Sequence, residues 1–368
     1  MKIEEARQLL NRYNSGQCTE EEKTFIERSF LSYNEHGIDI SSIKIEDLGR
    51  EVLSNLKKKT DRKSSLKLWI TFSGAAAAIA VILWMYYPNN SETESFELAE
   101  QIVPAGNQAI VTLSSGKQIS LSKTKSTLIV NPAHLSYDDG STIDAGTLTG
   151  YQTIRTPKGG EYKIVLSDGT KVWLNAATVL QYPSTFREQV ERRVKLVSGQ
   201  AYFEVAKDKK HPFIVSSQNQ DVTVLGTKFD INTYSNNVKT TLLEGSVRLN
   251  FNFNKKANMA SLILNPGDQS VNENDMFTKT STDTSLAVAW KNGRIKFRNA
   301  ELSSILSEAE RWYSIDVKYN GEIPDIQLTG GISRKSNLAT LLKLLKLSGI
   351  KFKVDNRSGR NTLTIESL

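Results

Sequence analysis

An uncharged run from Leu68 to Tyr87 constrains this chain more than any other feature of its sequence. A helix of about 20 residues rises roughly 30 Å, which is the thickness of the hydrocarbon core of a bilayer. A buried core helix of that length usually carries a polar stripe, and a cleaved signal peptide has a much shorter charged region ahead of its apolar part. The run therefore predicts a single transmembrane helix within residues 66–88.

The charges on either side of this run predict its orientation. Basic residues precede the run and acidic residues follow it, so the positive-inside rule places the N-terminal part in the cytoplasm and the rest on the other side of the membrane. The formal net charge of +7 includes this basic cluster. A basic cluster beside a membrane helix is typical of contact with anionic lipid, so it favours a lipid contact over a nucleic-acid site. The side chains expected to anchor the helix at the headgroups are Lys67, Trp69, Trp84, Tyr86 and Tyr87.

Residues 1–65 are predicted to form an all-α head. Thr19 and Glu22 make a capping box that begins a second helix, and a third helix follows from about Ile45. Three short helices give only a small core, so either a partner protein completes it or the head is a self-sufficient small bundle. The apolar residues that a partner would contact are Leu9, Leu10, Tyr13, Phe25 and Phe30.

Beyond the membrane helix the pattern changes to short strands. Residues 89–98 read as a polar linker, and residues 99–279 alternate apolar and polar residues between turns, which is typical of an all-β layered or barrel-like domain. An internal repeat supports this interpretation. The segment 104–121 recurs 53 positions later, at 157–174, and each copy has the pattern of a β-hairpin with a Ser-x-Gly turn.

Residues 290–368 change pattern again. Strands alternate with two amphipathic helical stripes, one from Leu302 to Trp312 and the other from Leu338 to Leu345. The resulting β-α-β-β-α-β order predicts a small α+β domain of the split βαβ type. The chain is thus predicted to be multidomain, with an all-α head, one transmembrane helix, an all-β domain and an α+β domain.

Few residues suggest catalysis or metal binding. With three histidines and a single cysteine, Cys18, the chain does not easily build a metal site, a Ser-His-Asp triad or a disulfide framework. Asp168, Asp221 and Asp230 are candidates for paired acid–base carboxylates, but Asp168 sits in a predicted turn, where aspartate is common for structural reasons. We expect no enzyme, no cofactor and no bound metal.

One pair of residues leaves two interpretations open. Gly226 and Thr227 interrupt a strand pattern, and a glycine at a β-bulge is the structural explanation. The chemical explanation is a single-turnover self-cleavage at Gly226–Thr227. The hydroxyl of Thr227 would attack the carbonyl of Gly226, exchanging the amide for an ester that water then hydrolyses.

Motifs in order along residues 157–269 resemble the periplasmic domain of the ferric-citrate-regulator type of anti-sigma factor. The motifs are Thr156-Pro157-Lys158-Gly159-Gly160, Leu166-Ser167-Asp168-Gly169-Thr170, Gly199-x-Ala201-Tyr202-Phe203-Glu204-Val205, Val224-Leu225-Gly226-Thr227-x-Phe229 and Pro266-Gly267-Asp268-Gln269. Trp290-x-x-Gly293 and Trp312-Tyr313-x-Ile315 resemble the C-terminal domain that such regulators carry in Bacteroidota. That domain is similar to the short N-terminal modules of secretins and TonB-dependent receptors.

The resemblance implies a relay across the inner membrane, with the N-terminus in the cytoplasm and the C-terminus in the periplasm. The head would bind an extracytoplasmic-function sigma factor, and the periplasmic part would respond to the signalling domain of a substrate-loaded TonB-dependent receptor. In some relatives a Gly-Thr bond in the block matching Gly226–Thr227 cleaves itself, and an intramembrane protease then frees the head. No direct contact with nucleic acid is expected. The alternative is a membrane-tethered periplasmic protein that binds glycans or serves a structural role without sigma-factor control.

Overall fold

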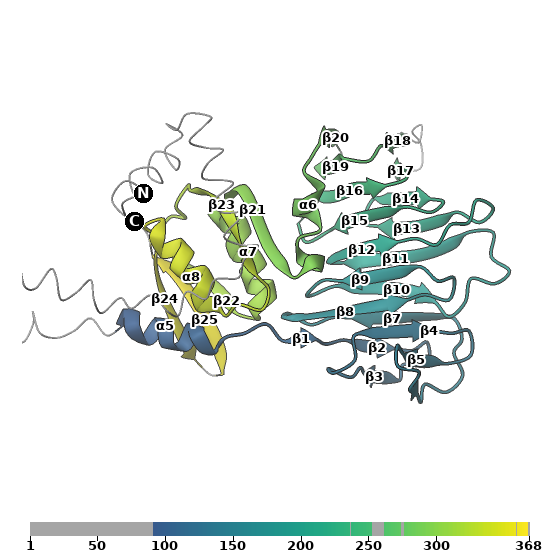
Figure 1. The fold of residues 1–368 in the computed structure, drawn as a ribbon, viewed down its shortest axis with the longest axis horizontal. Helices are drawn as coiled ribbons and strands as arrows, with labels where there is room; N and C mark the ends of the chain where they lie inside the picture. The colour runs from purple at the N-terminus through teal and green to yellow at the C-terminus, as the bar shows by residue number, and fades with distance from the viewer. Residues whose placement is uncertain (1–90, 236, 252–260, 274–275, 358, 367–368) are drawn as a thin grey trace, which may run out of the picture. The chain divides into compact units, whose positions relative to one another are not determined.

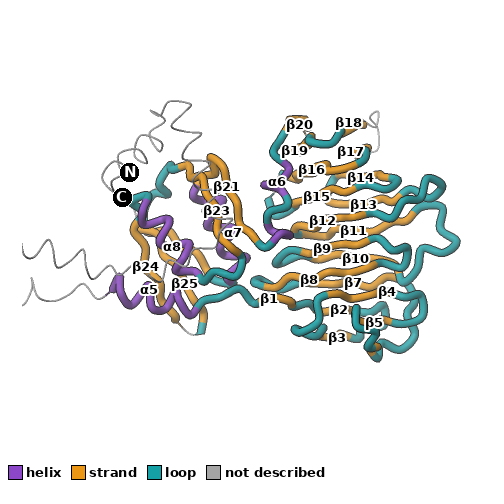
Figure 2. The backbone as a smooth tube through the Cα atoms, in the orientation of Figure 1, coloured by secondary structure: helices purple, strands orange, loops and turns teal. Residues whose placement is uncertain are grey.

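The computed structural model describes residues 91–235, 237–251, 261–273, 276–357 and 359–366. The predicted head and the predicted membrane helix lie outside these residues. Within them, no helix has the length and apolar character needed to cross a bilayer. The chain divides into two units, residues 1–93 and 94–368, and the second is compact. Strands dominate this second unit, which has one helix at its N-terminal end and its other helices within residues 284–347 (Figure 2).

Two packed β-sheets make up the domain that follows helix α5 (Ser91–Gln101). The chain builds them by crossing from one sheet to the other, mostly after every second strand (Figure 1). Among the described residues the sheets have eleven and nine strands. The first contains β1 (Gly106–Asn107), β4 (Thr127–Val130), β5 (Leu135–Tyr137), β6 (Thr142–Ile143), β8 (Gly160–Val165), β9 (Lys171–Leu174), β12 (Gln200–Glu204), β15 (Lys228–Asn232), β16 (Val238–Glu244), β19 (Asp268–Glu273) and β20 (Met276–Ser281). The second contains β2 (Ile110–Thr112), β3 (Gln118–Ser120), β7 (Tyr151–Arg155), β10 (Val179–Pro183), β11 (Arg192–Ser198), β13 (Phe213–Ser217), β14 (Gln220–Val224), β17 (Val247–Phe251) and β18 (Ser261–Leu264). The layered alternative of the sequence analysis is therefore the one observed.

Alternating apolar residues point inward from both sheets and fill the space between them. Phe203, Phe213 and Phe229 are fully buried at its centre, and the rings of Phe203 and Phe229 stack with their centroids 5.0 Å apart. Rings stacked in this offset manner add to the free energy gained by removing their apolar area from water. This inter-sheet core is what holds the two layers together.

The internal repeat is confirmed as two similar hairpins. Gly116, in the turn of β2–β3, and Gly169, in the turn of β8–β9, each have a φ of +86°, which side chains with a Cβ rarely adopt. In both turns a leucine N–H donates to the carbonyl four residues later, at 2.9 Å from Leu113 and 2.8 Å from Leu166. The two copies nevertheless lie in different sheets.

The C-terminal part forms a second, smaller α+β domain with its own core. Its elements are α6 (Thr284–Ala287), the short 3₁₀ turn η3 (Trp290–Asn292), β21 (Arg294–Glu301), α7 (Leu302–Tyr313), β22 (Asp316–Asn320), β23 (Gln327–Ser333), α8 (Leu338–Leu347), β24 (Lys351–Arg357) and β25 (Arg360–Glu366). The helical stripes predicted from sequence are the buried faces of α7 and α8. The strands divide into two sheets, β21–β23 and β22–β25–β24, and this differs from the single sheet of a split βαβ fold.

The segment predicted to be a polar linker is instead a helix. Helix α5 (Ser91–Gln101) packs against the C-terminal domain, where Ala99 is fully buried and the ring of Phe96 meets that of Phe352 edge-on at 5.3 Å. The Nδ2 of Asn337 donates to the carbonyl of Glu100 at 3.2 Å. The local sequence does not predict this helix, because only a few of its residues are apolar and their partners are far away in the chain.

Candidate functional site

The Gly226–Thr227 pair lies at a corner where the chain passes from one sheet to the other. Strand β14 ends at Val224 and β15 begins at Lys228, and these strands belong to different sheets. Gly226 has a φ of +148°, and a Cβ there would come within 2.6 Å of Cγ of Lys207. Glycine alone meets both constraints. This corrects the bulge interpretation. Gly226 lies at a corner between two sheets and is not an extra residue within one strand.

The hydroxyl of Thr227 is buried and oriented. Thr227 is 4 % exposed, and its Oγ1 donates to the carbonyl of Ser246 at 3.0 Å. That carbonyl fixes the hydroxyl but cannot take its proton, which an attack on the carbonyl of Gly226 requires. Cavities of about 210 and 490 Å³ are both lined by Gly226 and Thr227, so water has room beside this peptide. Self-cleavage stays a prediction.

The three aspartates considered as acid–base candidates have separate partners. Asp168 pairs with Arg192 at 2.7 Å, and Asp221 pairs with Arg193 at 2.8 Å. Asp230 is buried and accepts hydrogen bonds from an amide and an indole. Each carboxylate thus has a structural role of its own.

Asp230 lies at the joint between the β domain and the C-terminal domain. Its Oδ2 accepts from Nε2 of Gln200 at 2.9 Å, and its Oδ1 accepts from Nε1 of Trp290 at 3.1 Å. Burial raises the pKa of Asp230 to about 7, although both hydrogen bonds favour the charged form. Trp290 belongs to η3, directly before the first strand of the C-terminal domain, so the strength of this contact depends on the charge of Asp230.

An ion pair forms a second contact across the joint. Arg334, which is 6 % exposed, pairs with Glu161 of β8, and its guanidinium lies 4.2 Å from the ring centroid of Trp312. Burial raises the pKa of Glu161, against the opposing effect of Arg334. Nε and Nη2 of Arg334 and Nε1 of Trp312 have no hydrogen-bond partner among the described residues. Buried donors without acceptors are costly, so the buried guanidinium of Arg334 depends on its ion pair with Glu161.

Exposed pairs and cations over rings complete the joint. Nζ of Lys158 lies 2.7 Å from Glu310, and the ammonium of Lys291 lies 4.6 Å from the ring centroids of both Trp173 and Tyr202. Cations over aromatic faces stabilise by up to about 1 kcal/mol each at exposed sites. The joint therefore combines these directional polar contacts with apolar packing, since Tyr202 of the β domain belongs to the hydrophobic cluster of the C-terminal domain.

The remaining residues predicted to be functional are not described by the structure. The sigma-binding candidates Leu9, Leu10, Tyr13, Phe25 and Phe30 and the membrane anchors Lys67, Trp69, Trp84, Tyr86 and Tyr87 all lie outside the described residues. Among the described residues, no group of three or more His, Cys, Asp or Glu side chains is placed to hold a metal ion.

Two family models match the chain in order. The model of the FecR protein matches residues 152–248, and that of the FecR C-terminal domain matches residues 294–360. The chain therefore carries both FecR-type domains. It is also similar to crystal structures, at 1.65 and 2.50 Å resolution, of a protein from Parabacteroides distasonis ATCC 8503 proposed to be an anti-sigma factor. Sequence identity is 28 % to both, with TM-scores of 0.50 and 0.51 over 57 % and 59 % of this chain and 97 % and 100 % of the crystallised chains. No relative with a curated function matches the chain.

The joint connects the two parts that match FecR models. Glu161 and Asp230 lie within the FecR match, Arg334 lies within the C-terminal match, and Trp290 lies between the two. In the sequence, Trp290 belongs to a family motif, and Asp230 is recognisable only as a candidate acid–base carboxylate. No local pattern signals their contact, because 60 residues separate them.

Proposed function

We propose that this FecR-type protein crosses the inner membrane once and regulates an extracytoplasmic-function sigma factor. Residues 1–65 bind the sigma factor in the cytoplasm, and residues 94–368 respond in the periplasm to the signalling domain of a TonB-dependent receptor. The observation that carries the proposal is the order of the two family matches, FecR and then FecR C-terminal, behind an uncharged run long enough to span a bilayer.

The free edge of β22 supports contact with a receptor. In the order β22–β25–β24, no described strand pairs with the outer side of β22, and its residues Lys318, Tyr319 and Asn320 are exposed. An exposed strand edge can accept a strand from a partner through main-chain hydrogen bonds. The receptor's signalling domain would add its strand here.

Co-purification tests the sigma-factor contact. The full-length protein is expressed in membranes with the sigma factor encoded beside it, and a promoter reporter follows sigma activity. We expect the sigma factor to co-purify and the reporter to be repressed, and Phe25→Ala with Phe30→Ala to release both effects. Trp84→Leu, in the membrane segment, is the control. A protein that binds no sigma factor would instead support the tethered glycan-binding or structural alternative.

A substitution at the free edge tests the receptor contact. Tyr319→Asp places a charge on β22, and Lys353→Asp places one on β24 at the opposite edge of the same sheet. We expect Tyr319→Asp to abolish induction by the receptor's substrate while repression of the reporter persists, and Lys353→Asp to leave induction intact. Equal induction in both variants would remove β22 from the proposal.

Processing at Gly226–Thr227 belongs to the same relay, with an intramembrane protease acting after it. Immunoblots with tags at both ends distinguish the two interpretations of the corner. If Thr227 is the nucleophile, the wild type and Thr227→Ser yield two fragments and Thr227→Ala yields one band. One band from all three would leave Gly226 with its structural role alone.

A further inference from the structure

A cavity of about 700 Å³ lies at the β domain, where four loops meet the first residue of β11. Its walls include Asp168 from the β8–β9 turn, Arg187 and Glu188 from the β10–β11 loop, and Lys210 from the β12–β13 loop. Arg192 forms part of the same wall. Binding sites for small molecules typically have volumes of about 300 to 1,000 Å³.

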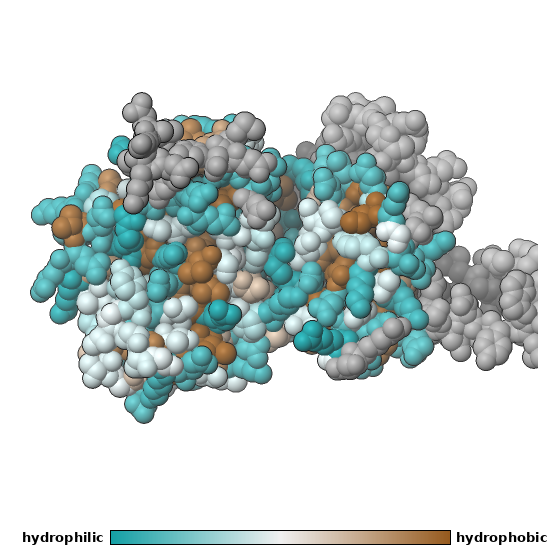
Figure 3. Space-filling view, turned by 180° about the vertical axis from the view of Figure 1, so that it is seen from behind, coloured by the Kyte–Doolittle hydropathy of each residue, from teal (hydrophilic) through white to brown (hydrophobic). Residues whose placement is uncertain are grey.

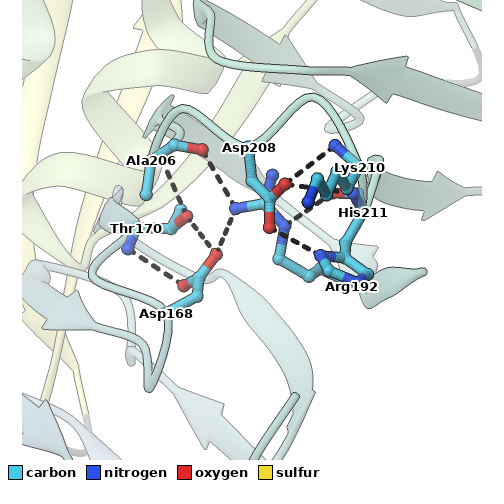
Figure 4. A network of polar contacts seen from close by, with 7 residues as sticks. All are labelled: Asp168, Thr170, Arg192, Ala206, Asp208, Lys210 and His211. Carbon is cyan, nitrogen blue, oxygen red and sulfur yellow. Dashed lines mark hydrogen bonds and ion pairs between the residues drawn. The ribbon is translucent and has the colours of Figure 1, made fainter. Parts of the chain in front are cut away.

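Arg192 is held rigidly in this wall. Its side chain is 4 % exposed, its Nη1 donates to Asp168 at 2.7 Å and to the carbonyl of Ala206 at 3.0 Å, and its Nε donates to the carbonyl of His211 at 2.9 Å (Figure 4). Thr170 in turn holds Asp168 through its hydroxyl, at 2.7 Å. The guanidinium is thus fixed before any ligand arrives.

One donor of this guanidinium remains unmatched. Nη2 of Arg192 is buried and has no hydrogen-bond partner among the described residues. A buried donor of a charged group without an acceptor is energetically costly, because it has lost its hydrogen bonds to water. The other donors of Arg192 are used by the protein, and its guanidinium lies 5.4 Å from the ring centroid of Phe213, so Nη2 is left unsatisfied behind the wall.

The cavity is lined by three cations, Arg187, Arg192 and Lys210, and by three carboxylates, Asp168, Asp208 and Glu188, and two of the cations have no ion pair among the described residues. Asp208 is occupied, because it accepts from the backbone N–H groups of Lys210 and His211 and lies 2.8 Å from Nδ1 of His211 (Figure 4). No described acidic side chain pairs with the exposed side chains of Arg187 and Lys210. Glu188 is the one lining carboxylate without an ion pair among the described residues.

The geometry points to a binding site for a small organic acid of about the size of one sugar ring, whose carboxylate meets the exposed cations Arg187 and Lys210 in front of the fixed guanidinium of Arg192. Arginine suits a carboxylate because its planar donors match the two oxygens. Hydroxyl and amide groups of Ser167, Thr185 and Gln189 line the cavity beside Phe186, so a polyhydroxylated body fits the rest of the space. The face of the molecule drawn in Figure 3 is largely hydrophilic, with hydrophobic residues in small separate patches.

Calorimetric titration of the full-length protein in detergent tests this site, with three probes of stated chemistry. D-glucuronate carries both the carboxylate and the hydroxyl groups, D-glucose carries only the hydroxyl groups, and sulfate carries only the charge. We expect glucuronate to bind at least tenfold more tightly than either of the others. A charge-assisted hydrogen bond is worth about 1.5–3 kcal/mol, and 1.4 kcal/mol corresponds to tenfold.

Variants on the rim locate the binding without disturbing the fold. Lys210→Ala and Arg187→Ala remove exposed cations, and we expect each to weaken glucuronate binding about tenfold. Lys209→Ala, one residue away and not among the lining residues, is the matched control and should bind as the wild type does. Arg192 itself is left intact, because its loss would leave Asp168 unpaired.

Four results would overturn the proposal. The first three are no heat of binding with glucuronate, equal binding of glucuronate and glucose, and equal losses in Lys209→Ala and Lys210→Ala. The fourth is sulfate binding as tightly as glucuronate, since the cavity would then hold an adventitious ion only. The titration needs no sigma factor or receptor, so its failure is separate from failure of the proposed relay.

Discussion

The inter-sheet core and the joint between the two domains are held together by different physical means. The core is closed and apolar, with fully buried phenylalanines between the sheets. The joint has some apolar packing, through Tyr202, and adds to it a buried aspartate, an ion pair and cations over rings. Apolar contact is non-directional and tolerates small shifts, whereas hydrogen bonds and ion pairs are lost when their partners separate. The core therefore maintains the shape of the β domain, and the joint is the place where a signal could change the arrangement of the two domains.

The largest expected effect is in the core. Phe203→Ala removes a fully buried ring that stacks on Phe229, so we expect a loss of about 3–5 kcal/mol in the free energy of unfolding. Urea unfolding of residues 94–368, the compact second unit, measures it. Phe96→Ala, which removes a ring from α5, is the comparison and should loosen α5 while the β domain stays folded. A β domain that tolerates Phe203→Ala would break the distinction between core and joint.

The joint should respond to pH through Asp230. Its pKa of about 7 in the folded chain exceeds the ordinary value of 3.8, so the folded protein keeps a proton that the unfolded chain releases between pH 4 and 7. The contribution of Asp230 to the free energy of unfolding has its full value below pH 4. It falls by about 2–4 kcal/mol as the pH rises to 7 and above.

Asp230→Asn removes this titration and keeps an oxygen that can accept from Trp290. We expect the difference in unfolding free energy between wild type and variant to change between pH 4 and 7.5. Parallel stability curves over that range would contradict the assignment. Side chains whose pKa is lowered, such as Asp268 beside Lys279, lose their stabilising effect at lower pH and contribute equally to both proteins.

The ion pair of the joint should have a local effect. Arg334→Met leaves Glu161 without its partner, and because Glu161 is partly exposed we expect a loss of about 2–3 kcal/mol rather than the full cost of a buried charge. Hydrogen exchange should rise in β23 and α8, while strands of the inter-sheet core keep their protection. Lys335→Met, at the exposed neighbour, is the matched control.

The elements that sequence reasoning could predict are those with local periodicity. The inward residues of the strands and the stripes of α7 and α8 repeat at the spacing of their own secondary structure, and the hairpin turns carry glycines where φ is positive. Helix α5 has no such stripe, and its partners lie in the C-terminal domain, so its local sequence resembles a linker.

The contacts of the joint and of the cavity wall are predictable only in part. Asp168 and Thr170 belong to a turn whose sequence is visible, but their pairing with Arg192 depends on loops that meet only in the folded domain. Asp230 and Trp290 are likewise far apart in sequence, and nothing in the residues around an aspartate predicts which side chain it will contact. Burial and long-range pairing, which the sequence does not encode locally, decide these roles.

The smallest expected effect is at an exposed contact of the joint, and it tests whether exposed contacts are weaker than buried ones. Lys158 and Glu310 are 42 % and 36 % exposed at the side chain and lie 2.7 Å apart. Exposed pairs contribute about 0–1 kcal/mol, because water screens the charges and ordering two long side chains costs entropy. Lys158→Ala should therefore lower the unfolding free energy by less than about 1 kcal/mol, and the difference should shrink further in high salt. Urea titrations at two salt concentrations measure it, and a loss as large as that of Arg334→Met would mean that charge, rather than burial, determines the strength of the joint.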